Sequence, residues 1–334
     1  MNHSSYRVGI IGGGAWGTAL SILANRAGST VMLGTRNNNV IQSILDRRTN
    51  DTYLPNVFID PNIAVTDKLG ETCGGDVLIL AVPSHMLRSA CISISDMLPV
   101  HLPIMIATKG IERGSLMLMS EVCKSILPHN PVAILSGPNF ADEAAGGLAT
   151  ATTIACTDET LWNMLTYSIG GRFFRPYMTD DIIGAQIGGA VKNIIAIACG
   201  IAMGKKLGEN ARAAIVTRGF AETSRLNQAK GGRYETLMGL SGLGDLILTS
   251  GSPKSRNTSF GIALGEGKTK EDILMHRGRT ANEGVTAAES ISKLARKLGV
   301  SMPICDAVHR VLHENASVDR LIEELLERPF TQEM

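Results

Sequence analysis

The chain has 334 residues, of which 44% are hydrophobic and 19% are charged, and its formal net charge is +1. This composition is typical of a globular protein and excludes a disordered chain, and the length predicts two domains. The balanced charge, without a block of lysine and arginine, argues against nucleic acid or an anionic membrane surface as a partner.

Targeting and cysteine patterns indicate a cytoplasmic protein. The apolar run at 8–11 ends in glycines, so no signal peptide is expected. The longest apolar segment, 187–203, contains Lys192 and Asn193, so we expect no insertion into a membrane. The six cysteines lack any Cys-x-x-Cys pair, which predicts free thiols and no bound metal.

The first half of the chain predicts an α/β fold with a doubly wound sheet of the Rossmann type. Continuous apolar runs such as 77–82 and 104–108 fit strands that are buried on both faces of a parallel sheet. Apolar residues at helical spacing, including Trp16, Leu20 and Leu23, follow the first of these runs. The expected strands are 7–11, 30–33, 76–82, 104–108, 132–135, 152–156 and 173–177.

The second half predicts an all-α domain, because strand-like runs disappear beyond Asp180. Asp180 and Asp181 are suitable N-cap residues for the first helix of that domain. We therefore expect a dinucleotide-binding domain at 1–179 and a helical substrate or catalytic domain at 180–334. The expected helices are 181–203, 210–228, 234–239, 258–265, 270–276, 285–298, 303–313 and 318–327.

A Gly-x-Gly-x-x-Gly fingerprint lies between the first expected strand and a helix that starts at Ala15. Gly12 would permit the tight turn, Gly14 would let the backbone approach a pyrophosphate, and Gly17 would let helix and strand pack closely. The helix N-terminus would face the phosphates with unpaired N–H groups. A ligand-free glycine turn is the alternative, but the strand before and the helix after favour a dinucleotide.

The end of the second expected strand favours NADPH over NADH. NAD-preferring sites usually place an acidic residue there to hold the ribose hydroxyl groups. This chain has Leu33-Gly34-Thr35-Arg36-Asn37 instead, and a guanidinium at Arg36 can pair with a 2′-phosphate. The alternative is that Arg36 is a solvated loop cation, in which case NADH would serve equally well.

The carboxyl ends of two later strands carry residues suited to a ligand. Lys109-Gly110 follows the strand at 104–108, where the lysine either lines a cleft or caps the sheet edge. Gly137-Pro138 follows the strand at 132–135, where it forms either an ordinary turn or one whose N–H groups face a phosphate. His85 is interpreted as a loop residue.

Lys192 is the strongest candidate for catalysis, because it interrupts an almost wholly apolar helix. Glycines within a helix cost stability, so Gly188 and Gly189 indicate that something approaches this face closely. A lysine without hydration is a suitable proton donor to the alkoxide that forms when a hydride reduces a carbonyl. The alternative is a lysine whose stem packs while its ammonium reaches water.

A glycine-broken segment at 240–249 carries one acid, Asp245, followed by the triplet Ser255-Arg256-Asn257. Asp245 would orient Lys192, bind a substrate hydroxyl or merely cap a helix. Arginine is the natural bidentate ligand of a phosphate, and serine and asparagine add neutral donors. The triplet alone is also common in ordinary loops.

Together these stretches resemble the bacterial NAD(P)-dependent glycerol-3-phosphate dehydrogenases over nearly the whole chain. The matching segments run in family order: GGGAWGTALS at 12–21, AVPSH at 81–85, ATKGIE at 107–112, SGPNFADE at 136–143, GGAVKNIIAIACG at 188–200, TRGFAE at 217–222, LSGLGDLILT at 240–249, SRN at 255–257 and NEG at 282–284.

The resemblance implies a reaction, the reduction of dihydroxyacetone phosphate to sn-glycerol 3-phosphate for phospholipid synthesis, with Lys192 as the general acid/base. It also implies a homodimer and two sets of binding residues. The implied substrate-binding residues are Lys109, Gly137, Lys192, Asp245, Ser255, Arg256 and Asn257, with Asn193 and Thr249 as further candidates. The implied cofactor-binding residues are Gly12, Gly14, Ala15, Trp16, Gly17, Arg36, Lys109, Ala141, Arg256, Ala281 and Glu283.

One position departs from the family, and two other functions compete. Asn139 stands where the family usually has a hydroxyl residue, and because asparagine can still donate to a phosphate, only the detail of that contact is left open. A β-hydroxyacid dehydrogenase of the 6-phosphogluconate type usually has asparagine four residues after its lysine, whereas this chain has Ala196 there and Asn193 next to the lysine. A non-catalytic NADPH sensor would not need a lysine among apolar residues.

Overall fold

The structure is a computed structural model that describes residues 5–277 and 283–329. The chain separates into two compact units. The first unit extends to Lys109 and also contains Met117–Ala185, whereas the second contains Gly110–Leu116 and the chain from Gln186 onward. We describe each unit by itself.

The first unit is built on an eight-stranded sheet in the order β3-β2-β1-β4-β5-β6-β7-β8. The strands β1 to β6 are parallel, and the order 3-2-1-4-5-6 is that of the dinucleotide-binding fold. The strands are β1 (Arg7–Ile11), β2 (Thr30–Gly34), β3 (Ala64–Thr66), β4 (Val77–Leu80), β5 (Ile104–Ile106), β6 (Val132–Ser136), β7 (Thr150–Cys156) and β8 (Phe174–Thr179).

Helices cover both faces of this sheet. One apolar cluster joins the sheet to α1 (Ala15–Arg26), α2 (Asn38–Arg47), α5 (Ala141–Ala145) and α6 (Trp162–Ile169). A second cluster, on the other face, joins it to α3 (Leu87–Ile94) and α4 (Met119–Ile126). Because β4 and β5 are buried at every position, their continuous apolar sequences follow from this double cover.

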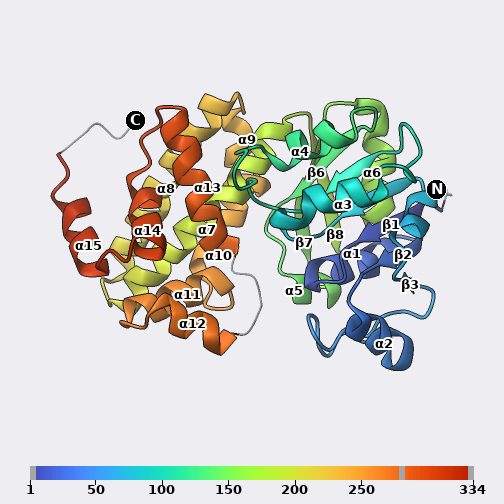
Figure 1. Ribbon diagram of the computed structural model, residues 1–334, viewed down its shortest axis with the longest axis horizontal. Helices are drawn as coiled ribbons and strands as arrows, with labels where there is room; N and C mark the ends of the chain where they lie inside the picture. Colours follow the sequence, from blue (N-terminus) through green and yellow to red (C-terminus); the bar gives the residue numbers. More distant parts are fainter. Residues whose placement is uncertain (1–4, 278–282, 330–334) are drawn as a thin grey trace. The chain divides into compact units, whose positions relative to one another are not determined.

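The second unit is helical among its described residues (Figure 1). Its long central helix α7 packs against α11 at close backbone distance, since a Cβ at Gly200 or Gly204 would meet backbone atoms of α11. The helices are α7 (Ile182–Gly204), α8 (Glu209–Lys230), α9 (Tyr234–Met238), α10 (Asp245–Gly251), α11 (Arg256–Gly265), α12 (Lys270–Arg277), α13 (Glu283–Lys297), α14 (Pro303–His313) and α15 (Val318–Leu326).

The helix α7 is long and apolar enough to cross a membrane by length and composition alone. Most of it is buried inside the protein, as in the core helix of a globular fold. Its N-terminus is capped by Asp181, whose Oδ1 accepts the Gly184 N–H at 2.8 Å. An acidic residue at this position was expected from the sequence.

Three features of the fold differ from the sequence-based expectation. The short edge strand β3 was not predicted, and α10 was not recognised among the glycines of 240–249. The sheet is not wholly parallel, because β7 runs antiparallel to β6. The apolar runs alone do not encode strand direction, which is set by the connection between the strands.

Candidate functional site

The glycine-rich turn between β1 and α1 has the geometry of a phosphate cradle. Gly12 has φ = +129°, a conformation that side chains other than glycine rarely adopt. A Cβ at Gly17 would meet the Gly12 carbonyl oxygen, so this glycine lets the helix pack on the turn. Gly14, the N-cap of α1, has open space on its Cβ side, and the first helical turn carries no acidic residue. The turn therefore has room and N–H donors for an anion.

Arg36 lies beside this turn, directly after β2. The neighbouring Thr35 contacts the turn, because a Cβ at Gly13 would lie 2.6 Å from the Thr35 Oγ1. Arg36 itself is exposed, and Asn37 caps α2 by accepting the Asn39 N–H at 3.1 Å. Arg36 is thus an exposed residue two positions beyond the end of β2.

A second group of candidates meets at the carboxyl ends of β5 and β6. The Lys109 Nζ donates to the Gly137 carbonyl oxygen at 3.1 Å, which joins the two strand ends. The Asn139 Nδ2 donates to the Thr152 Oγ1 at 3.0 Å, and its Oδ1 is buried without a partner in the described chain. The amide therefore braces the turn through Thr152, and its contact with a phosphate stays a prediction. Ala141 begins α5.

Trp16 lies in the first turn of α1, and a cavity lies at the other end of the same helix. The Trp16 ring lies 6.5 Å from the Phe174 ring, centroid to centroid, within the packing of α1 on the sheet. The cavity has a volume of about 400 Å³ and is lined by the C-terminal ends of α1, α5 and α6.

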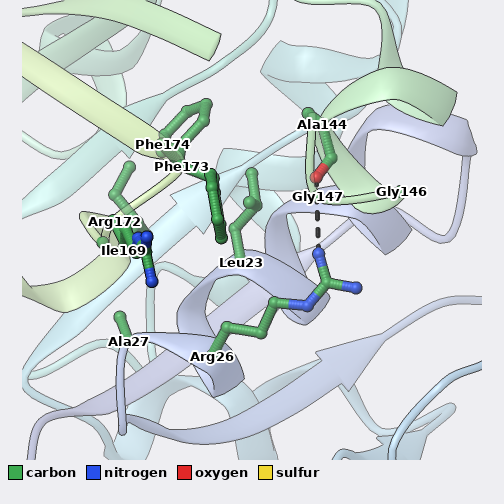
Figure 2. A pocket seen from close by; sticks show the side chains of 11 residues that line it. Leu23, Arg26, Ala27, Ala144, Gly146, Gly147, Ile169, Arg172, Phe173 and Phe174 are labelled. Carbon is green, nitrogen blue, oxygen red and sulfur yellow. Dashed lines mark hydrogen bonds between the residues drawn. The ribbon is translucent and has the colours of Figure 1, made fainter. Parts of the chain in front are cut away.

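Figure 2 shows Arg26 in this cavity reaching toward the Ala144 carbonyl oxygen, 3.5 Å from its Nη1. Arginines near helix C-termini interact favourably with the carbonyl ends of those helices, which accounts for Arg26 without a ligand. The Arg172 guanidinium lies over the Phe173 ring, 5.2 Å from its centroid. The cavity is at the opposite end of α1 from the glycine-rich turn, roughly 18 Å away for a helix of this length. It is not the cofactor site.

In the helical unit, Lys192 is held by two side chains of α10. Its Nζ lies 2.5 Å from the Asp245 Oδ1 and donates to the Thr249 Oγ1 at 2.8 Å. The lysine side chain is 11% exposed and that of Asp245 only 1%. Of the roles considered for Asp245, orienting Lys192 is the one that this contact supports, and it stays a prediction. The alternative interpretation required the Lys192 ammonium to reach bulk water, and this burial does not fit it.

The close approach of α7 to the turn Leu240–Gly244 brings this pair together. A Cβ at Gly188 would lie 2.5 Å from the Ser241 carbonyl oxygen and 2.8 Å from the Gly242 Cα. The gap beside Gly188 that the sequence indicated is thus occupied by the protein's own backbone. This contact places Asp245, the first residue of α10, against the lysine one turn along α7.

A chain of amides links three helices beside Lys192. The Asn257 Nδ2 donates to the Asn193 Oδ1 at 2.8 Å, and the Asn257 Oδ1 accepts the Gly284 N–H at 3.1 Å. Asn257 therefore ties α11 to α7 and to the first turn of α13, where Glu283 lies. The Ser255 hydroxyl caps α11 by accepting the Thr258 N–H at 3.3 Å, and Arg256 is exposed.

The structure thus gathers the candidates into two sets, one in each unit. The sheet unit holds the glycine-rich turn, Arg36, Lys109, Gly137 and Ala141. The helical unit holds Lys192, Asn193, Asp245, Thr249, Asn257, Ser255, Arg256 and Glu283. Ala281 lies outside the described residues. Sequence reasoning gave Thr249 only a secondary place, although its spacing of four residues from Asp245 already put both on one helix face.

Comparisons with known proteins identify the family of the chain. The family model for the NAD-dependent glycerol-3-phosphate dehydrogenase N-terminus matches residues 7–162, and the model for its C-terminus matches residues 181–323. A relative from Parvibaculum lavamentivorans named glycerol-3-phosphate dehydrogenase [NAD(P)+] is 46% identical over 98% of both chains. A relative of the same name from Rhodospirillum rubrum is 46% identical over 100% of this chain and 95% of its own.

The chain belongs to the NAD-dependent glycerol-3-phosphate dehydrogenase family. The crystal structure of glycerol-3-phosphate dehydrogenase from Coxiella burnetii superimposes with a TM-score of 0.93 at 38% identity, covering 97% of this chain and 99% of that one. A ketopantoate reductase from Ralstonia eutropha shares the fold alone, with 17% identity and a TM-score of 0.61. As a family member the chain is an oxidoreductase, which excludes the non-catalytic sensor.

Proposed function

We propose that this glycerol-3-phosphate dehydrogenase reduces dihydroxyacetone phosphate to sn-glycerol 3-phosphate, reversibly, with NADPH preferred over NADH. The single observation that carries the mechanism is the lysine of α7 held by Asp245 and Thr249 at 2.5 and 2.8 Å. The glycine-rich turn fits the cofactor, because it offers open space and helix N–H groups to a pyrophosphate. The product supplies phospholipid synthesis.

Lys192 serves as the proton donor. When bound, the reduced nicotinamide supplies a hydride to the C2 carbonyl carbon of the substrate. The Lys192 Nζ gives a proton to the carbonyl oxygen, so an N–H bond breaks as the O–H bond of the product forms. Asp245 and Thr249 keep the ammonium in place before the reaction, and in the reverse direction the neutral amine takes the proton back.

The substrate phosphate needs cationic and neutral donors, and the candidates are spread over both units. Arg256, at the exposed start of α11, is suited to a bidentate contact with phosphate. Lys109 and the backbone at Gly137 would contribute from the ends of β5 and β6. Ser255 and Asn257 stay predicted contacts, since the structure gives their side chains a capping role and a linking role.

A substrate panel tests this function. Oxidation of NADPH should be followed with dihydroxyacetone phosphate, with ketones derived from simple hydroxyacids, and with the keto compounds that 6-phosphogluconate-type enzymes use. We expect turnover with dihydroxyacetone phosphate and little with the others. Faster turnover of a keto acid would instead favour the β-hydroxyacid dehydrogenase reaction.

The preference for NADPH is tested at Arg36. Replacing Arg36 with Ala removes the cation that would pair with the 2′-phosphate, so kcat/KM for NADPH should fall by about 10- to 100-fold. The value for NADH should stay within about twofold of the parent. Equal kcat/KM values for the two nucleotides in the parent enzyme would refute the preference. The cytoplasmic location and the homodimer also stay predictions.

A further inference from the structure

A buried asparagine outside the fingerprint holds the glycine-rich turn. Asn50 follows α2 in the chain and is fully buried. Its Nδ2 donates to the Gly13 carbonyl oxygen at 2.9 Å and to the Thr18 Oγ1 at 2.8 Å, and its Oδ1 accepts the Tyr53 N–H at 3.3 Å. Because the Gly13 oxygen can only accept, the amide orientation is unambiguous.

This contact determines which way a key peptide unit faces. In a trans peptide the carbonyl of one residue and the N–H of the next point in opposite directions. Holding the Gly13 carbonyl inward on Asn50 therefore turns the Gly14 N–H outward. Gly14 has open space beside it and precedes the first turn of α1, where an anion would meet the unpaired N–H groups of the helix.

The segment that carries Asn50 is itself anchored. The Ser43 hydroxyl donates to the Thr49 carbonyl oxygen at 2.7 Å, and the Ile59 N–H donates to the Arg48 carbonyl oxygen at 2.8 Å. Leu54 is buried in the apolar cluster under the sheet. The amide is thus presented from a fixed support, which is what a positioning role needs.

We propose that Asn50 is a positioning residue for the cofactor, which fixes the Gly13–Gly14 peptide with its N–H toward the pyrophosphate. The inference rests on the proposed use of NAD(P) by this site. Without the amide, the Gly13 carbonyl loses its buried donor, and the peptide can turn its oxygen toward the phosphates. Since both nucleotides share the pyrophosphate, Asn50 acts on NADH and NADPH alike, unlike Arg36.

The test is direct binding of NADH and NADPH to Asn50→Ala, measured by nucleotide fluorescence on the full chain. We expect both dissociation constants to rise by about 10- to 100-fold, the effect of one lost hydrogen bond that supports a charged ligand. The KM for the nucleotide should rise with it, while kcat at saturating nucleotide stays near the parent value. Because the binding of both nucleotides should weaken equally, the ratio of the dissociation constants for NADPH and NADH should not change.

Asn130→Ala is the matched control, because Asn130 is also a buried amide of the sheet unit that donates to two carbonyl oxygens, those of Pro99 and Leu102. Asn130→Ala should lower the melting temperature without weakening the binding of either nucleotide. If Asn50→Ala weakens nucleotide binding no more than Asn130→Ala does, the inference is wrong.

Thr18→Val provides a second variant if Asn50→Ala does not fold. It removes one of the two acceptors of the amide, and we expect both nucleotides to weaken by about threefold or more. Unchanged binding in that variant would overturn the inference. A parent enzyme that binds neither nucleotide would refute the proposed function itself, whereas tight binding by the parent together with unchanged variants would refute only the role of Asn50.

Discussion

Lys192 and Asp245 form an ion pair with little access to water, their side chains being 11% and 1% exposed. Removing two charges from water costs several kcal/mol per ion, and their attraction offsets this only in part, so such pairs contribute little net stability. The pair is better explained by its chemistry. A proton donor that must face a developing alkoxide benefits from partners that fix its position beforehand.

Thr249 tests how much that positioning matters. In Thr249→Val the shape of the side chain is kept, but the hydroxyl that accepts from the Lys192 Nζ at 2.8 Å is lost. We expect kcat to fall by about tenfold or more, the usual effect of a hydrogen bond to a charged group, while the KM for the nucleotide is unchanged. Thr249→Ser should restore kcat. A valine variant with the parent kcat would show that the hydroxyl is dispensable.

Residues with a local signature could be found from the sequence, and those with only distant partners could not. Gly12, Gly14 and Gly17 stand at fixed spacing after a strand, and Lys192 is conspicuous in an apolar helix. Asn50 contacts residues 37 and 32 positions away, and nothing near it in the chain indicates this. Its contribution became visible only with the fold.

At the scale of elements, glycines decide where α7 can meet its neighbours. Gly188 lets the turn Leu240–Gly244 approach, and Gly200 and Gly204 let α11 approach. The sequence correctly indicated a close approach beside Gly188, but it could not tell a ligand from a backbone. The same glycines in 240–249 that allow the contact also hid α10, because glycine is unfavourable within helices.

The predicted strands include those whose sequences are apolar and buried. The runs that became β1, β4 and β6 are continuous and apolar, so their burial is encoded locally. The three residues of β3 are only partly buried and lack the continuous apolar run of the equally short β5. The antiparallel pairing of β7 depends on contacts between distant segments. Element type was thus set by the local sequence, and edge strands and strand direction were set by the whole sheet.

The helix α14 begins on a buried carboxyl group, which makes the helical unit sensitive to pH. The Glu222 side chain accepts the Ile304 and Cys305 N–H groups at 2.7 and 3.1 Å. Burial nevertheless raises the pKa of Glu222 to about 7. Between its unfolded pKa near 4.5 and this value, the folded chain keeps a proton that the unfolded chain releases, so the contribution of Glu222 to stability is fully present below pH 4.5 and is lost as pH rises through 7.

Urea unfolding at pH 5 and pH 8, followed by circular dichroism, measures this effect. The contribution of Glu222 should be lost over that interval and amounts to about 3 kcal/mol at most. Glu222→Gln, which cannot ionise, should show a correspondingly smaller decrease in the free energy of unfolding. An unchanged pH dependence in the glutamine variant would contradict the assignment.

At the scale of the whole molecule, the conjunction of motifs in one order predicted the family, although each motif alone was weak. The division of the chain into two units was harder to predict from the sequence. The sequence predicts a boundary at 179/180, which stays a prediction, while the compact units divide between Ala185 and Gln186. The segment Gly110–Leu116 belongs to the helical unit, where the Arg113 Nη2 lies 2.5 Å from the Glu289 Oε2. A contact across so many residues has no local signal.

The central claim concerns proton transfer by Lys192, and the most direct measurement is the kcat of Lys192→Ala with dihydroxyacetone phosphate, beside its affinity for NADPH. Because this change leaves Asp245 buried without its partner, Lys192→Ala/Asp245→Asn serves as the control for folding. The account predicts that kcat falls by about 100- to 10,000-fold in both variants, with NADPH bound as tightly as by the parent. Near-normal turnover by either variant would contradict it.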